Sequence, residues 1–140
     1  MKNWPGQVFA NTVTRADWGT IQTVAITHTF AGLPVADYTA AYDWYARLLG
    51  RPADMFPHDR EAVWRLTPTC SIYVVQDPER AGRGLVTLAL DDLDAHARRL
   101  REAGLASAEQ ADGSAPRRLV LKDVDGNTLT FFQDPAQSGV

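Results

Sequence analysis

The order of strand-like and helix-like patterns occurs twice along this chain. Each copy has a strand, an aspartate at a helix N-cap position, a helical pattern ended by glycine, and a strand hairpin closing on Gln-Asp-Pro. A fixed order that recurs after roughly 55 to 57 residues indicates a duplicated supersecondary unit, and two such units usually build one site between them. The copies comprise residues 30–35, Asp37, Gly50 and 76–78, and then residues 85–90, Asp92, Gly104 and 133–135.

The composition is that of one globular domain. The chain has 140 residues, of which 45% are hydrophobic, enough to bury a core. The formal net charge of −3, with basic residues scattered along the chain, argues against a nucleic-acid partner. The single cysteine cannot form an internal disulfide, and we find neither a signal-peptide pattern nor a run of about 18 apolar residues. We therefore expect a cytoplasmic protein with no membrane partner.

The duplicated unit divides the chain into segments. We expect residues 1–22 to form an N-terminal arm and residues 23–136 a single domain, with module one at about 23–78 and module two at about 84–135. In the second module, Asp125-Gly126 is a strong hairpin signal. It predicts strands at residues 118–122 and 128–133, and their counterparts in the first module are residues 62–66 and 71–76.

Four segments in a fixed order carry a family resemblance. They are Leu33-Pro34-Val35-Ala36-Asp37, Trp44-Tyr45, Leu49-Gly50 and Asp123-Val124-Asp125-Gly126-Asn127. Together they resemble the vicinal oxygen chelate superfamily, which includes glyoxalase I, extradiol dioxygenases and bleomycin-resistance proteins. The resemblance covers roughly residues 28 to 135. It implies an α+β fold of two tandem βαβββ modules, whose curved mixed sheet surrounds a central cup. It also implies a homodimer, in which a second subunit can complete the cup.

In the metal-dependent members of this superfamily, four side chains in the cup bind a divalent ion. The family spacing places these positions at Phe30, Tyr73, Leu85 and Thr130. A divalent ion needs imidazole nitrogen or carboxylate and amide oxygen, so none of the four is a good ligand. We therefore expect no metal and no other cofactor, and we assign no catalytic residue. The alternative is that His28, two residues before Phe30 and on the same strand face, enters a metal site.

No other constellation points clearly to chemistry. We expect His58, in a loop, and His96, on the exposed side of the second helix, to be solvated. Ser71 has no evident His and Asp partners for nucleophilic catalysis. Asp123 and Asp125 could suggest a calcium loop, but a structural hairpin is favoured.

Strand pairing across the hairpins predicts which side chains line the cup. A two-residue Asp125-Gly126 turn places Leu121 opposite Thr130, and the same pairing in the first module places Trp64 opposite Tyr73. This wall is aromatic and apolar and suits a flat or apolar organic molecule, although the same side chains could simply fill the concavity. The predicted ligand-binding residues are Phe30, Gly32, Pro34, Trp64, Tyr73, Val75, Leu85, Thr87, Leu121, Thr130 and Phe132.

Three functions remain open at this point. The favoured function is a metal-free protein that binds or sequesters an aromatic or apolar metabolite or drug. The second is an enzyme of the same superfamily, either a metal-dependent lyase or dioxygenase or a metal-independent isomerase. The third is a dimeric structural or regulatory module with a vestigial cup. The sequence does not name the ligand.

Overall fold

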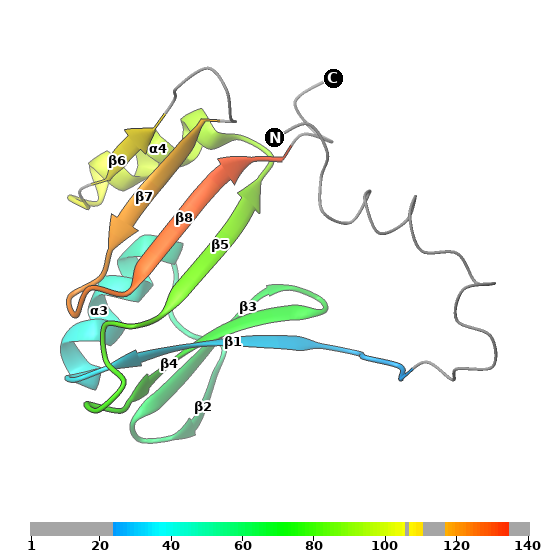
Figure 1. Cartoon of the computed structure of the whole chain (residues 1–140), viewed down its shortest axis with the longest axis vertical. Helices are drawn as coiled ribbons and strands as arrows, with labels where there is room; N and C mark the ends of the chain where they lie inside the picture. Colours follow the sequence, from blue (N-terminus) through cyan, green and yellow to red (C-terminus); the bar gives the residue numbers. More distant parts are fainter. Residues whose placement is uncertain (1–23, 106, 111–116, 135–140) are drawn as a thin grey trace.

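The duplicated βαβββ order is present in the fold (Figure 1). The computed structural model describes residues 24–105, 107–110 and 117–134, so the expected arm at residues 1–22 lies outside the described residues. The first module contains β1 (Thr29–Val35), α3 (Tyr38–Leu49), β2 (Met55–His58), β3 (Glu61–Thr67) and β4 (Cys70–Gln76). The second contains β5 (Leu85–Leu90), α4 (Leu93–Glu102), β6 (Ala108–Gln110), β7 (Arg118–Lys122) and β8 (Thr128–Gln133). None of the helices described is long and apolar enough to cross a membrane.

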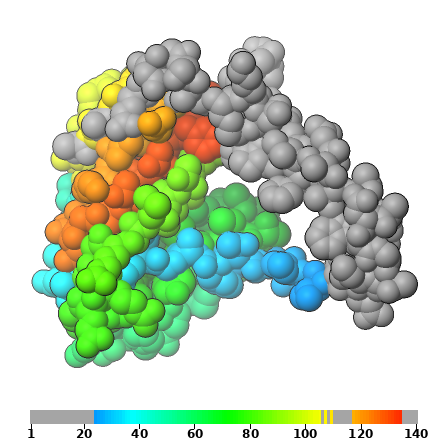
Figure 2. Space-filling model, in the orientation of Figure 1, coloured from blue at the N-terminus to red at the C-terminus, as the bar shows by residue number. Residues whose placement is uncertain are grey.

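Each module forms its own four-stranded mixed sheet. The first sheet has the order β1-β4-β3-β2, and the second sheet has the equivalent order β5-β8-β7-β6. The first strand of each module pairs in parallel with the last one, whereas the remaining pairs are antiparallel. The α+β fold class with two tandem βαβββ modules is therefore confirmed. In both sheets the first strand is an edge strand, and Figure 2 shows β1 in blue and β5 in green at the surface.

The repeated motifs perform the same local task in both modules. The Asp37 carboxylate accepts hydrogen bonds from the backbone N–H groups of Thr39 and Ala40, and the Asp92 carboxylate accepts one from Ala95. Such caps satisfy N–H groups that have no partner within the helix. At the other end of α3, Gly50 adopts a left-handed conformation with φ of 76°, which favours glycine.

The recurring Gln-Asp pair joins the end of each module to its beginning. The Oε1 atom of Gln76 accepts a hydrogen bond from the first N–H of α3 at 3.1 Å, and Gln133 does the same for α4 at 3.0 Å. The N–H of the following aspartate donates to the last carbonyl of the first strand, at 2.8 Å from Asp77 and 2.7 Å from Asp134. The repeat in the sequence is therefore a repeat of hydrogen-bonding roles.

The two modules share one hydrophobic core. One face of each sheet contributes buried side chains to it, together with the inner sides of α3 and α4. We call the other face of each sheet its open face. Because core burial fixes the alternation of each strand, it also decides which residues the open faces present. The core members include Leu33, Val35, Tyr45, Leu48, Trp64, Ile72, Val74, Leu93, Leu100, Leu119, Leu121, Leu129 and Phe131.

A buried polar network connects the modules beside this core. The Tyr45 hydroxyl donates to the Asp123 carboxylate at 2.7 Å, and the same carboxylate accepts from the side chain of Asn127 at 2.7 Å. Asn127 also donates to the carbonyl of Pro34 and accepts from the N–H of Gly84. The network therefore links α3 and β1 of the first module to the β7–β8 turn. Burial and the adjacent Asp123 carboxylate raise the pKa of Tyr45 far above its usual value, so its hydroxyl remains a donor.

The ends of the two helices contact each other through arginine side chains. Arg99 of α4 donates to the carbonyls of Arg47 and Leu48 at the end of α3, and Arg47 donates to the carbonyl of Ala103 at the end of α4. These donors satisfy carbonyls that the helices leave unpaired and place positive charge at the negative ends of the helix dipoles.

His96 is not solvated as the sequence suggested. Its ring lies 4.3 Å, centroid to centroid, from the ring of Phe131, and its Nε2 atom is buried. The reason is that α4 turns this position toward the second sheet. Burial and then the neighbouring Arg99 charge lower the pKa of His96 to about 4, so the imidazole is neutral at pH 7.

Candidate ligand-binding site

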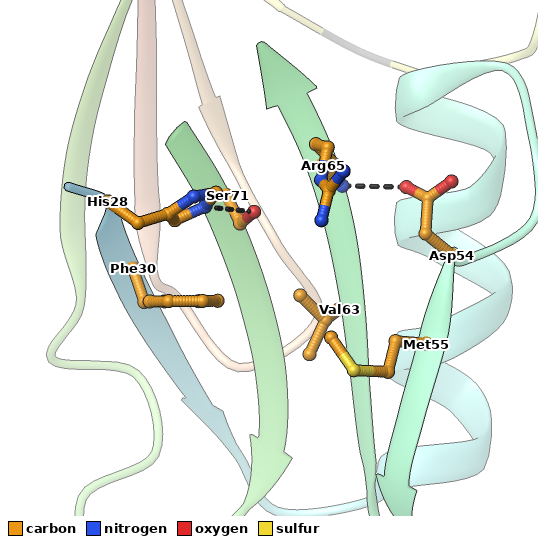
Figure 3. A pocket seen from close by; sticks show the side chains of 7 residues that line it. All are labelled: His28, Phe30, Asp54, Met55, Val63, Arg65 and Ser71. Atoms are coloured by element: carbon orange, nitrogen blue, oxygen red, sulfur yellow. Dashed lines mark hydrogen bonds between the residues drawn. The ribbon is translucent and has the colours of Figure 1, made fainter. Parts of the chain in front are cut away.

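The open face of the first sheet contains a cavity of about 470 Å³ (Figure 3). This volume lies within the range of small-molecule pockets. All of its lining residues belong to the first module: three to β3 and β4, two to β1 and the segment before it, and two to β2 and the residue before it. They are His28, Phe30, Asp54, Met55, Val63, Arg65 and Ser71.

One part of the pocket is apolar. The side chains of Phe30, Val63 and Met55 lie along the same side of the cavity in Figure 3. Val63 is almost fully buried, whereas Phe30 is 54% exposed and Met55 is 47% exposed. Exposed apolar side chains of this size, gathered in a concave surface, are typical of a place where another molecule binds.

The opposite part of the pocket is polar. The Nε2 atom of His28 lies 2.8 Å from the Oγ atom of Ser71, and the His28 ring lies 4.4 Å from the ring of Phe30. Ser71 therefore has a histidine partner, which the sequence did not show. Within the described ranges, no carboxylate forms a hydrogen bond to His28, so the arrangement is a pair rather than a Ser-His-Asp triad.

A second polar group is formed by Asp54 and two arginines. Arg51 donates to both oxygens of the Asp54 carboxylate, at 2.9 and 2.8 Å, and the backbone N–H of Arg65 donates to it at 2.6 Å. These bonds, the Arg65 backbone bond first and the Arg51 bond second, lower the pKa of Asp54. Arg51 also donates to the carbonyl of Arg65. The Arg65 guanidinium itself extends to the pocket (Figure 3).

Most residues predicted to line a cup do lie on an open face, but they are divided between the two sheets. Phe30, Gly32, Pro34, Tyr73 and Val75 share the open face of the first sheet, as their cross-strand pairing shows. The others on an open face belong to the second sheet, namely Leu85, Thr87, Thr130 and Phe132. Of all these residues, only Phe30 lines the cavity described above.

Gly32 and Tyr73 are in close contact on the open face of the first sheet. They are direct partners in the β1–β4 ladder, and a Cβ atom added at Gly32 would lie 2.5 Å from the Cζ and Oη atoms of Tyr73. The missing side chain at Gly32 therefore makes room for the aromatic ring across β1.

The predicted positions of Trp64 and Leu121 are wrong. Trp64 pairs with Ile72 rather than Tyr73, and Leu121 pairs with Leu129 rather than Thr130. Both side chains are therefore turned into the shared core, where Trp64 is 0% exposed, stacks on Tyr42 and donates from its indole to the Arg51 carbonyl at 3.0 Å. A shift of one residue in the pairing moves every side chain of a strand to the other face.

The turn between β7 and β8 explains this shift. It is not a two-residue Asp125-Gly126 turn, because the ladder ends at the pair Lys122 and Thr128 and leaves five residues between them. The Asp123 carboxylate accepts hydrogen bonds from the N–H groups of Asp125 and Asn127, both at 2.9 Å, and so holds the wider turn. The β3–β4 connection likewise has an irregular register, between Arg65 and Thr67.

The donors available at the family's metal positions do not fit a divalent ion. Phe30 and Tyr73 lie on the open face of the first sheet, and Leu85 and Thr130 lie on that of the second. Their side chains offer no imidazole or carboxylate. Across the parts of the chain that the structure describes, no group of three or more His, Cys, Asp or Glu side chains is placed to hold a metal ion.

The sequence prediction missed the polar residues of the pocket. Arg65 and Val63 alternate with Trp64 in β3, so a one-residue change of register would have placed them on the open face. The contact between His28 and Ser71 joins residues 43 positions apart in the sequence, so no local pattern predicts it.

The chain matches known proteins in both sequence and structure. The model of the family described as "Glyoxalase-like domain" matches residues 29–132. Among curated proteins, none matches. A glyoxalase/bleomycin-resistance protein from Catenulispora acidiphila is 37% identical, with a TM-score of 0.74, over 77% of this chain and 98% of that one.

Two further solved structures have a similar fold. An antibiotic-binding protein from a Streptomyces species is 27% identical, with a TM-score of 0.64, over 79% of this chain and 98% of that chain. A lactoylglutathione lyase from Agrobacterium tumefaciens, at 13% identity, has a TM-score of 0.63 over 75% of this chain and 91% of that one. Because the family model covers well over half of the sequence, the chain belongs to the glyoxalase-like domain family of the vicinal oxygen chelate superfamily.

Proposed function

We propose that this protein is a metal-free small-molecule-binding protein that sequesters an apolar or aromatic metabolite or drug. The observation that carries the proposal is the cavity of about 470 Å³ on the open face of the first sheet. Its partly exposed Phe30 and Met55 side chains offer an apolar surface that a ligand would remove from water.

The comparisons support this class of function. The Streptomyces relative at 27% identity is described as an antibiotic-binding protein. A bleomycin-binding protein solved with bleomycin shares the fold at 21% identity, with a TM-score of 0.63. Within this fold, binding an intact small molecule is therefore an established use.

The charge of the pocket supports the metal-free part of the proposal. The Arg65 guanidinium lines the cavity and would repel a divalent cation placed there. The one carboxylate of the lining, Asp54, already accepts hydrogen bonds from Arg51 and from the Arg65 backbone. A metal ion would have to compete with these donors for the carboxylate oxygens.

We also propose that the protein is a cytoplasmic homodimer. The two sheets have unpaired edge strands, and Leu85 on the open face of the second sheet is 76% exposed. Since the described pocket is lined by the first module alone, the open face of the second sheet is available to cover the pocket of a partner subunit.

Light scattering after size-exclusion chromatography tests the dimer. Leu85→Lys should shift the protein toward the monomer, because it places a charge on an apolar contact surface. Val124→Lys, at a position 53% exposed in the β7–β8 turn, is the matched control and should leave the mass unchanged. A wild-type protein that is monomeric at micromolar concentration would contradict this part of the proposal.

A thermal-shift screen of aromatic natural products and small metabolites tests the binding function. A ligand at 100 times its dissociation constant should stabilise the fold by about 2.7 kcal/mol. Elemental analysis of the purified protein should find no stoichiometric metal. If metal is present and binding or turnover is lost on chelation, the metal-free proposal is wrong. If no compound of these classes stabilises the protein, the third possibility, a dimeric module with a vestigial cup, gains support.

The alternative function is a metal-independent enzyme. The observation that favours it is the 2.8 Å contact between His28 and Ser71 inside the pocket, because a histidine beside a hydroxyl can move a proton. Mass spectrometry of a bound compound after prolonged incubation separates the two functions. A sequestering protein returns the compound unchanged, whereas turnover that is lost in Ser71→Ala would establish the enzyme.

A further inference from the structure

We propose that the pocket selects apolar molecules that carry an anionic group, with the Arg65 guanidinium as the anion-binding element. This inference rests on the proposed small-molecule-binding function and specifies the chemical class of the ligand. A carboxylate, sulfonate or phosphate attached to an aromatic or aliphatic body would fit the description.

The first observation is that the Arg65 guanidinium takes part in none of the ion pairs formed among the described residues. The ion pairs of the described residues involve Arg47, Arg51, His58, Arg80 and Arg117, and none involves the Arg65 guanidinium. Its hydrogen bonds to Asp54 and Arg51 are made by the backbone N–H and carbonyl. The five N–H donors of the guanidinium therefore remain available for a carboxylate or phosphate-like partner.

The second observation is that Asp54 is occupied by a different arginine. Both of its oxygens accept from the Nη1 atom of Arg51, at 2.9 and 2.8 Å. The pocket region thus contains two guanidinium groups and one carboxylate, which leaves a net positive charge beside the cavity. A cationic ligand would be repelled at this point and an anionic ligand attracted.

The third observation is the division of the pocket into two parts. Figure 3 shows His28, Ser71 and Arg65 on one side and Phe30, Val63 and Met55 on the other. The hydroxyl of Ser71 and the imidazole of His28 can add hydrogen bonds to an anion held by Arg65. The apolar side chains can at the same time cover the rest of the molecule. The arrangement suits a ligand with one charged end and one apolar end.

Two fluorescent probes of similar shape test the charge selection. The first is 8-anilinonaphthalene-1-sulfonate, which carries an anionic group, and the second is N-phenyl-1-naphthylamine, which lacks it. Titration of the wild-type protein should give saturable binding of both, with the sulfonate bound more tightly. Arg65→Gln should lower the affinity for the sulfonate about 5- to 10-fold and change the affinity for the neutral amine by less than about 2-fold. Added salt should weaken binding of the sulfonate to the wild-type protein more than binding to Arg65→Gln.

Three further variants complete the test. Arg98→Gln, on the exposed side of α4, removes the same charge away from the pocket and should change neither affinity. Arg65→Lys keeps the charge and should retain part of the preference for the sulfonate. Phe30→Ala removes an apolar contact and should weaken both probes.

The outcomes separate this inference from the proposed function. If both probes bind and Phe30→Ala weakens them, but Arg65→Gln affects the two probes equally or not at all, anion selection is wrong while small-molecule binding stands. If neither probe binds saturably, or if binding is insensitive to Phe30→Ala, the binding pocket is wrong and the anion selection falls with it. Circular dichroism of each variant verifies that the fold is retained.

Discussion

The ring of Tyr73 lies across the backbone of Gly32, so close that a Cβ atom at Gly32 would be 2.5 Å from the ring. The two residues are ladder partners in the parallel pair of β1 and β4. The absence of a side chain on one strand thus allows an aromatic ring to cover the edge of the open face. This contact joins two residues that the sequence singled out separately.

Gly32→Ala tests the contact because its effect on the free energy of unfolding should depend on whether the Tyr73 ring is present. In the wild-type background it should destabilise the protein by about 1 to 2 kcal/mol, because the Tyr73 ring must move. In a Tyr73→Ala background the same change should be neutral or should stabilise by up to about 1 kcal/mol, because alanine loses less backbone entropy on folding than glycine. Urea denaturation of the four proteins measures the coupling. Equal effects in both backgrounds would show that the ring does not occupy this space.

Trp64→Phe should lower stability without changing ligand affinity directly. The indole N–H donates to the Arg51 carbonyl inside the core, and its loss leaves that acceptor without this donor. We expect a cost of about 1 to 3 kcal/mol in chemical denaturation. Probe titration should give nearly wild-type affinity, since Trp64 is turned away from the open face. A large loss of affinity in a protein of normal stability would show that Trp64 contacts the ligand.

Tyr45→Phe should weaken the connection between the modules. The Tyr45 hydroxyl donates to the buried Asp123 carboxylate at 2.7 Å, and hydrogen bonds to charged groups contribute about 1.5 to 3 kcal/mol. We expect a loss of that size in the free energy of unfolding. Tyr38→Phe is the matched control on the same helix, because the Tyr38 hydroxyl has no hydrogen-bond partner among the residues described. Its free energy of unfolding should stay within about 0.5 kcal/mol of the wild-type value.

The two repeated glutamines should respond differently to the same substitution. Gln76→Glu keeps an oxygen for the first N–H of α3 and adds negative charge at a helix N-terminus, so stability should be unchanged or slightly higher. Gln133→Glu should cost about 1 to 3 kcal/mol, because Gln133 also donates through Nε2 to the carbonyl of Asp91 at 2.6 Å. Thermal denaturation at pH 7 compares them. Equal effects would mean that the Asp91 contact contributes nothing.

His96 should make stability depend on pH. Its folded pKa of about 4 lies below the ordinary value of 6.5, so the unfolded chain binds more protons between these pH values. The stability contributed by the neutral ring is fully present above pH 6.5 and is lost as the pH falls through about 4. Because the ring is only half-buried and solvent screens its charge, we expect the free energy of unfolding to fall by about 1 kcal/mol over this pH range.

Urea denaturation between pH 6.5 and 4 provides the measurement. His96→Gln should flatten the pH dependence in this window. A wild-type pH dependence that persists unchanged in His96→Gln would assign the effect to the carboxylates instead.

Local features of the sequence were sufficient to predict the duplicated order of strands and helices, and the family resemblance implied the fold class. Asp37 and Gly50 bound α3 because capping depends on one residue and its immediate neighbours. The strands at residues 118–122 and 128–133 have the predicted bounds, since alternation and turn residues mark them locally. The repeated Gln-Asp pair marked the ends of both modules and has the same hydrogen bonds in each.

The pocket depended on contacts that no local pattern contains. The wider turn held by Asp123 shifted the β7–β8 register by one residue and turned Leu121 inward, and a one-residue shift in the first module did the same to Trp64. A single residue of register is invisible in a repeating pattern but reverses the faces of a strand. The pairing of His28 with Ser71 and the position of Arg65 beside Phe30 arise only when distant strands meet. The sequence alone determined the modules and their order, whereas tertiary packing decided which side chains the modules present to a ligand.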